Sequence, residues 1–211
     1  MKLKVGQKKI FAVGEFNLGK EVMVSDPSYE VGIWCQAKLN SVKAGKYIGF
    51  AEMIHDADWG VRVSRLYAIN KDFASREYWN WELDSNEIGV DSGQAGIFDM
   101  SNYRNDQVEF QNVPNVPFMD DMKGDEAGDT WYRNITKITL NKDYGIYESG
   151  IFSRSGIGDG GYSLYTEYED GEVIGICIDF HMDFDGDDIE VRDGLKYFWY
   201  DVINNELSNS K

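Results

Sequence analysis

The chain is poor in cysteine, proline and histidine. Its 211 residues include two cysteines, three prolines and two histidines. Cys35 and Cys177 are too few for a disulfide framework or a four-thiolate zinc site, so both are expected to be reduced core residues. Because no proline-rich linker and no repeat of fixed period interrupt the chain, we expect one globular domain over residues 1–211.

Long apolar runs are also missing. No window approaches the roughly 20 apolar residues of a membrane-spanning helix. The first 16 residues carry lysines but lack the apolar segment of a signal peptide. The expectation is a cytoplasmic protein with no membrane partner.

Basic residues are outnumbered by acidic ones. There are 37 carboxylates against 21 lysines and arginines, which gives a net charge of -16. A field of this sign repels phosphate backbones and anionic lipids, so we expect no nucleic-acid polymer as a partner. It would favour a basic protein or a divalent cation, although acidity also serves solubility.

Apolar residues, at 42% of the chain, are numerous enough for a core. The strongest local signal is residues 162–182, "YSLYTEYEDGEVIGICIDFHM", two β-favouring runs joined at Asp170-Gly171, which is typical of a tight hairpin turn. Alternation in the second run predicts one core face and one opposite face. The core face would hold Ile174, Ile176, Ile178, Phe180 and Met182, and the other Val173, Gly175, Cys177, Asp179 and His181.

Further strands recur about every ten to twelve residues, which favours a mainly β (α+β) fold with antiparallel sheets in a sandwich or a curled sheet. The predicted strands are residues 8–13, 21–25, 33–39, 45–54, 61–69, 133–140 and 144–152, with a β-like run at 79–90.

Few helices are expected. One is a short helix over 100–106, capped by Ser101, and another is a C-terminal helix over 194–207 that covers one sheet face. Residues 111–130 combine prolines, glycines and acidic residues, which predicts a mobile acidic surface loop, either a lid or an insertion.

Residues 153–162, "SRSGIGDGGY", form a glycine-rich stretch that formally matches the dinucleotide pattern G-x-G-x-x-G at Gly156, Gly158 and Gly161. That pattern needs a helix to begin at its last glycine, whereas "YSLYTEY" alternates like a strand. We therefore reject a Rossmann site. A loop whose backbone N–H groups form an anion nest and a flexible turn between strands both remain open.

Residues 88–99, "IGVDSGQAGIFD", form a second glycine-aspartate stretch. Two loops of one style suggest a shared ligand site with carboxylates, neutral hydrogen-bonding groups and one arginine. Two unrelated turns are the alternative. The predicted ligand-binding residues are Asp91, Ser92, Gly93, Gln94, Arg154, Ser155, Gly156, Gly158, Asp159, Gly160 and Tyr162.

The order "SDPSY", a central "WG", "GVDSGQAGIFD" and "SRSGIGDGGY" followed by a hairpin resembles an uncharacterised bacterial and phage-borne family, a domain of unknown function. The resemblance covers most of the chain. It implies the positions of site residues but no mechanism. This chain has Ile157 where the family pattern has tryptophan. The positions carried over are Asp26, Pro27, Gly89, Asp91, Ser92, Gly93, Asp99, Ser155, Gly156, Gly158, Asp159, Gly160 and Tyr162.

Other catalytic patterns are weak. His55 and His181 are the only histidines, and no G-x-S-x-G elbow accompanies them, so we assign no catalytic residue. A row of Cys177, Asp179 and His181 could supply metal ligands, but alternation also explains it. The acidic run at 183–188 lacks the glycine and glutamate positions of an EF-hand, so no metal site is assigned.

The leading hypothesis is a non-enzymatic binding protein that holds, and could sequester, a small polar ligand such as a nucleotide-derived signal. Most aromatic residues would be core, and a minority, drawn from a set that includes Trp34 and Trp59, could stack on a planar ligand. One alternative is an acidic inhibitor or immunity factor that binds a basic protein. The other is a metal-dependent phosphoesterase using Asp91, Asp159 and either Asp26 or Asp99. Cofactor and ligand identity stay open, and a homo-oligomer is compatible with the sequence.

Overall fold

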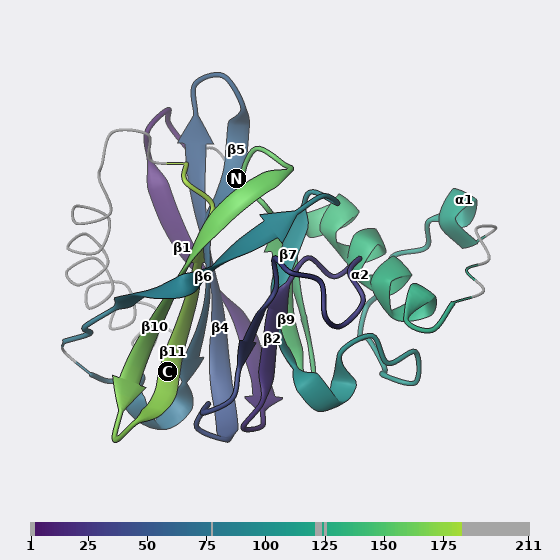
Figure 1. Cartoon of the computed structure of the whole chain (residues 1–211). Helices are drawn as coiled ribbons and strands as arrows, with labels where there is room; N and C mark the ends of the chain where they lie inside the picture. The colour runs from purple at the N-terminus through teal and green to yellow at the C-terminus, as the bar shows by residue number, and fades with distance from the viewer. Residues whose placement is uncertain (1–2, 77, 121–123, 125, 183–211) are drawn as a thin grey trace.

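A computed structural model describes residues 3–76, 78–120, 124 and 126–182 of the chain (Figure 1). The predicted C-terminal helix over 194–207 and the acidic run at 183–188 lie outside these residues. Within them, no helix combines the length and apolar character needed to cross a membrane.

The described chain is mainly β, as predicted, with two antiparallel sheets (Figure 1). The six-stranded sheet has the order β1 (Lys8–Leu18), β4 (Gly45–Asp56), β5 (Gly60–Asn70), β11 (Glu172–Asp179), β10 (Gly160–Glu169) and β6 (Glu82–Val90). The five-stranded sheet has the order β3 (Ala37–Leu39), β2 (Val22–Ser25), β7 (Gln94–Asp99), β9 (Gly150–Arg154) and β8 (Tyr144–Tyr147).

Three apolar layers organise the two sheets. The central layer packs side chains of both sheets against each other, including Val24, Ile97, Leu66 and Ile176. A second layer covers the outer face of the six-stranded sheet. The third lies between the five-stranded sheet and α2 (Asp129–Lys142), on the side away from the other sheet (Figure 1). The middle strand of this smaller sheet, β7, is therefore buried on both faces along its whole length.

The predicted hairpin at Asp170-Gly171 is confirmed. Both residues have positive φ, 51° and 80°, which matches a two-residue turn of the twist that antiparallel strands prefer. The predicted faces need one correction. Glu167 pairs with Gly175 and Tyr168 with Val173, so Ile174 is an extra residue in a bulge. Ile174 therefore packs in the outer layer and Val173 in the central one.

The strand predicted over 133–140 is wrong, because this segment belongs to α2. Trp131, Ile135 and Ile138 follow helical spacing and are buried against the small sheet. The cap of the helix comes from a distant position. Asp106 accepts hydrogen bonds from the backbone N–H groups of Gly128 and Trp131, at 2.9 Å each.

Several boundaries also differ from the prediction. Residues 144–152 form two strands, β8 and β9, with a tight turn at Glu148-Ser149. The predicted strand 33–39 shrinks to β3. The helix expected over 100–106 is a 3₁₀ turn, η2 (Met100–Asn102), capped by Asp99 and not by Ser101. Residues 111–130 include the short helix α1 (Pro117–Asp120) and the first turn of α2, and their mobility stays a prediction.

Replacing Asp106 should destabilise the fold through α2. Asp106→Ala removes the partner of two helix N–H groups, and we expect the free energy of unfolding to fall by about 1–2 kcal/mol. Urea denaturation measures the change. Glu109→Ala, an exposed carboxylate in the same loop, is the matched control and should change stability by less than about 0.5 kcal/mol. Equal effects of the two substitutions would contradict the capping role.

Candidate functional site

The carboxylate of Asp26 joins two loops. Asp26 is fully buried at the end of β2, where Pro27 fits the second position of a turn closed by Tyr29 N–H and the Asp26 carbonyl at 3.2 Å. Its Oδ1 accepts from Ser28 N–H and from the Ser92 hydroxyl, both at 2.7 Å. Its Oδ2 accepts from the N–H groups of Asp91 and Ser92, at 2.9 and 2.7 Å. The "SDPSY" and "VDSG" motifs are thus one hydrogen-bonded unit.

The second glycine loop is closed by its own hydrogen bonds. Gly158 N–H donates to the Ser155 carbonyl at 2.7 Å, and the Ser155 hydroxyl donates to the Gly158 carbonyl at 2.7 Å. The Tyr162 hydroxyl lies 2.6 Å from the Gly158 carbonyl and 3.0 Å from the Ser155 carbonyl. Gly156 has a φ of 49°, and a Cβ atom there would lie 3.0 Å from the Phe180 carbonyl oxygen, so a larger residue would be strained. The loop is therefore closed by hydrogen bonds between Ser155 and Gly158 and by those of the Tyr162 hydroxyl.

The two loops lie side by side. Gln94 at the start of β7 pairs with Arg154 at the end of β9, so the segments before and after these residues leave the sheet together. Ser155 N–H donates to the Gly93 carbonyl at 3.1 Å. A Cβ atom on Gly93 would lie 4.0 Å from the Cα atom of Gly158. The sequence left open whether the loops share a site or are two unrelated turns, and the structure places them next to each other. Their binding of a ligand stays a prediction.

A cleft of about 320 Å³ opens beside the paired loops. Its walls come from both glycine loops, from α2, and from the β4–β5 hairpin at Trp59 and Arg62. The described lining residues are Trp59, Arg62, Ser92, Gly93, Gln94, Thr136, Thr139, Leu140, Arg154, Gly156, Ile157 and Gly158. Two of these are arginines and, among the described residues, none is acidic.

Six of the eleven predicted site residues line this cleft, namely Ser92, Gly93, Gln94, Arg154, Gly156 and Gly158. Their free hydrogen-bonding capacity is smaller than predicted. The Ser92 hydroxyl is used by Asp26. Gln94 is buried, donates to the Thr136 hydroxyl at 3.2 Å and accepts from the Thr139 hydroxyl at 2.9 Å, which ties α2 to β7. The available charged donor among the predicted residues is Arg154.

The other five predicted residues do not line the cleft. They are Asp91, Ser155, Asp159, Gly160 and Tyr162. Asp91 and Asp159 are both exposed, and Asp91 accepts a hydrogen bond from the Tyr29 hydroxyl at 2.7 Å. Burial, and then this bond to Asp91, raise the pKa of Tyr29 above its ordinary value. Burial likewise raises the pKa of Tyr162, so both tyrosines remain protonated donors to their loops at neutral pH.

Two positions carried over from the family resemblance stabilise the fold through hydrogen bonds or close packing. Asp99 accepts from the N–H groups of Ser101, at 2.9 Å, and of Gly19, so it anchors the turn before β2 and caps η2. Gly89 lies against Cys35, where a Cβ atom would be 2.7 Å from the cysteine sulfur. Neither position belongs to the cleft.

Besides Ile157, which lies within the second glycine loop, sequence reasoning did not predict that Trp59, Arg62, Thr136, Thr139 and Leu140 line the cleft. The first two lie in the β4–β5 hairpin, and nothing local links them to the glycine loops. The other three lie on α2, which the sequence pattern placed in a strand. The helical spacing of Trp131, Ile135 and Ile138 was the signal that would have predicted a helix here, and with it a helix face beside the glycine loops.

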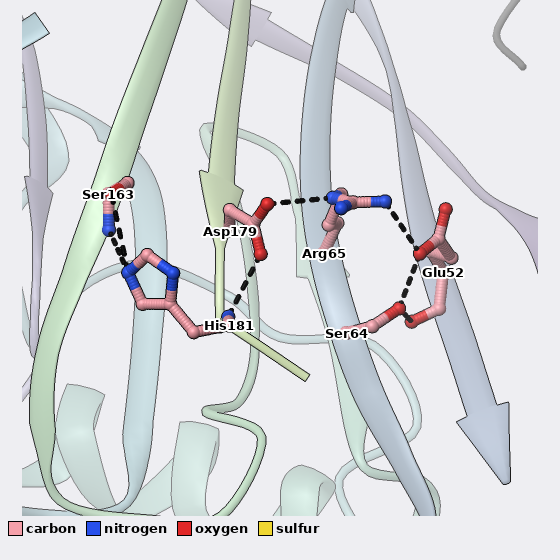
Figure 2. A network of polar contacts seen from close by, with 6 residues as sticks. All are labelled: Glu52, Ser64, Arg65, Ser163, Asp179 and His181. Atoms are coloured by element: carbon pink, nitrogen blue, oxygen red, sulfur yellow. Dashed lines mark hydrogen bonds and ion pairs between the residues drawn. The ribbon is translucent and has the colours of Figure 1, made fainter. Parts of the chain in front are cut away.

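A buried charge network lies elsewhere, on the outer face of the six-stranded sheet (Figure 2). Arg65 donates to Asp179 at 2.9 Å and to Glu52 at 3.2 Å, and the Ser64 hydroxyl donates to Glu52 at 2.6 Å. Burial opposes the charge of Arg65, but the facing carboxylates outweigh it and raise its pKa. Neighbouring Cys177 has a raised pKa, mainly through burial, so its thiol stays protonated.

Ser163, His181 and Asp179 do not form a catalytic triad, although Figure 2 shows them close together. Asp179 accepts from the backbone N–H of His181 at 2.9 Å, not from its ring. The imidazole Nε2 lies 3.2 Å from both the N–H and the hydroxyl of Ser163. His181 has a φ of 51°, which takes it out of the strand row, so the row of Cys177, Asp179 and His181, to which no metal site was assigned, is interrupted.

A larger hollow of about 570 Å³ lies between β1, β8 and residues 109–114. Its described lining mixes three glutamates, Glu15, Glu109 and Glu148, with two lysines, Lys46 and Lys142. Glu15 is already paired with Lys46 and Lys71. We place the candidate site at the smaller cleft, because its charges share one sign and its walls include both glycine loops.

Among the described residues, no three or more histidine, cysteine, aspartate or glutamate side chains gather where they could hold a metal ion. Comparison of the chain with protein-family models, curated proteins and solved structures finds no match. The resemblance to the phage-borne family therefore stays a prediction.

The buried Asp26 carboxylate should be essential for the loop pair. Asp26→Asn replaces one acceptor oxygen by an amide NH₂ group that faces backbone N–H donors, and we expect a loss of about 2–4 kcal/mol in the free energy of unfolding. Asp91→Asn, which changes charge equally at an exposed carboxylate, should cost less than about 1 kcal/mol. Denaturant titration of both variants measures the difference, and similar losses would refute the anchoring role of Asp26.

Proposed function

We propose that this protein binds a small anionic ligand in the cleft between the two glycine loops and α2. One observation carries the proposal. In a chain with 37 carboxylates and 21 basic residues, the described lining of this cleft contains Arg62, Arg154 and no carboxylate. A random selection from this chain would place about two acidic residues among twelve. Clusters of one sign in a concave site raise the local concentration of the opposite charge.

The two guanidinium groups remain accessible to a ligand. Arg154 has a side chain 43% exposed, and its Nε lies 3.7 Å from Asp143, a surface pair that contributes little to stability. Arg62 donates to the Val61 carbonyl at 2.9 Å and forms no ion pair with a described residue. Arginine binds carboxylate and phosphate groups through two parallel N–H donors, so either anion suits the pair.

In this proposal the glycine loops contribute the shape of the cleft more than they contribute hydrogen-bond donors to the ligand. Gly93, Gly156 and Gly158 let the backbone line the cleft without side chains. The hydroxyl groups of Ser92 and Tyr162 already have acceptors, and the described lining of the cleft holds no histidine, cysteine or carboxylate that could activate a nucleophile. Binding without catalysis is therefore the function that the cleft supports best, and sequestration of a nucleotide-derived signal is a specific form of it.

Calorimetric titration with inorganic phosphate, pyrophosphate, citrate and adenosine monophosphate tests this proposal. We expect at least one anion to bind. Arg62→Ala and Arg154→Ala should each weaken it about tenfold or more, because each removes a charge-assisted hydrogen bond. Lys38→Ala removes the same charge outside the cleft and should leave binding unchanged. Absence of binding by every anion, or equal effects of all three variants, would end the proposal.

A protein-interaction function is the second candidate, favoured by the loop over residues 30–36. Trp34 is 92% exposed, and Val31 and Ile33 beside it are exposed as well. The loop is held in shape by Gln36, which accepts from Gly32 and Ile33 N–H at 2.9 and 3.0 Å and donates to Ser25. A rigid exposed tryptophan is typical of a binding hot spot. Glu30 and Asp91 nearby would suit a partner with a basic rim.

Trp34→Ala should abolish capture of such a partner. With the wild-type chain as bait in a lysate of the cells that carry the gene, we expect a basic protein to be retained at low salt and released as salt screens the rim charges. The Trp59→Ala chain, altered at another exposed tryptophan, should retain the same protein. Capture that is identical for wild type and Trp34→Ala would argue against this candidate.

A further inference from the structure

The mouth of the cleft carries three large apolar side chains that the fold leaves partly in water. Trp59 is 49%, Leu140 49% and Ile157 43% exposed. They come from three elements, the β4–β5 hairpin, α2 and the β9–β10 loop, yet all three line the same cleft. Most other large apolar residues of the described chain are buried in the three layers. Exposed apolar groups that gather around one concavity mark a contact surface.

The backbone turn that carries Trp59 is fixed by hydrogen bonds. Asp56 accepts hydrogen bonds from the N–H groups of Asp58 and Trp59, both at 2.8 Å, which fixes the turn that carries the indole. Arg62 follows three residues later in β5, and Arg154 ends β9 of the opposite sheet. The cleft therefore combines an apolar rim with two cationic groups.

We infer that the ligand is an amphiphilic anion, a planar aromatic ring system attached to a phosphate or carboxylate group. This inference rests on the proposed function and names its ligand class. The ring would lie against Trp59, Leu140 and Ile157, and the anion would accept hydrogen bonds from Arg62 and Arg154. A volume of about 320 Å³ is at the lower end for ligand sites, so it suits one ring system and excludes a polymer or a dinucleotide.

The rim favours a ligand with an aromatic ring over a ligand with a simple aliphatic chain. An indole and a guanidinium both stack on planar π-systems, so the ring gains contacts from Trp59 and from an arginine at once. Leu140 and Ile157 add apolar area at the edges. An inorganic anion would use the arginines alone and leave the apolar rim in water.

The test compares phenyl phosphate with inorganic phosphate by calorimetry on the full chain. We expect phenyl phosphate to bind about tenfold tighter, since the ring removes apolar area from water. Trp59→Ala should reduce this advantage to about twofold or less, and Ile157→Ser should reduce it partly. Trp34→Ala, at an exposed tryptophan outside the cleft, should preserve it.

Phenylacetate, the anion of phenylacetic acid, and adenosine monophosphate extend the comparison. Tight binding of phenylacetate would show that a carboxylate serves, and binding of the nucleotide alone among the aromatic anions would narrow the class to nucleotides; both results support the inference. Equal affinities for phenyl phosphate and inorganic phosphate, each dependent on Arg154, would overturn the inference and leave the proposed function intact. Binding of none of these anions would overturn both.

Discussion

A single buried carboxylate decides the arrangement on which the cleft depends. Asp26 is fully buried, and its two oxygens accept four hydrogen bonds from two loops. A buried charge is costly unless such donors surround it, so the turn after β2 and the turn before β7 must form together. Because β7 pairs with β9, the same constraint sets the position of the second glycine loop. The wall of the cleft is thus determined by a residue that contacts the lining at Ser92 but does not itself line the cleft.

The small sheet has a structural reason to carry this site. Both of its faces are covered, one by the six-stranded sheet and one by α2, so its strands are almost continuously apolar. In the central strand β7, the polar side chains stand at the two strand ends. Gln94 and Arg154 stand at such ends, and the hydrogen bonds of Gln94 to two threonines hold α2 over them. Helix, strand ends and loops therefore converge at one rim of the sandwich.

What the sequence predicted well depended on short-range chemistry. The Asp170-Gly171 turn was predictable because two residues with positive φ define it, and the two glycine loops shared a recognisable style. The failures have non-local causes. The cap of α2 comes from Asp106, which is distant in the sequence. The β-branched residues of α2 suggested a strand and outweighed the helical spacing in the prediction. The bulge at Ile174 exchanged the faces of Val173 and Ile174. Trp59 and Arg62 reach the cleft only because the sheets pack, which no local pattern reveals.

The contrast between a chain of net charge -16 and a cleft lined by two arginines has a kinetic consequence. At low ionic strength an approaching anion is repelled by the field of the whole molecule, whereas at physiological ionic strength that field is screened beyond roughly 8 Å and the guanidinium groups dominate close to the cleft. The repulsive barrier grows with the charge of the incoming molecule. Under the proposed function, the acidity of the remaining surface would therefore slow the entry of polyanions more than that of singly charged anions when little salt is present.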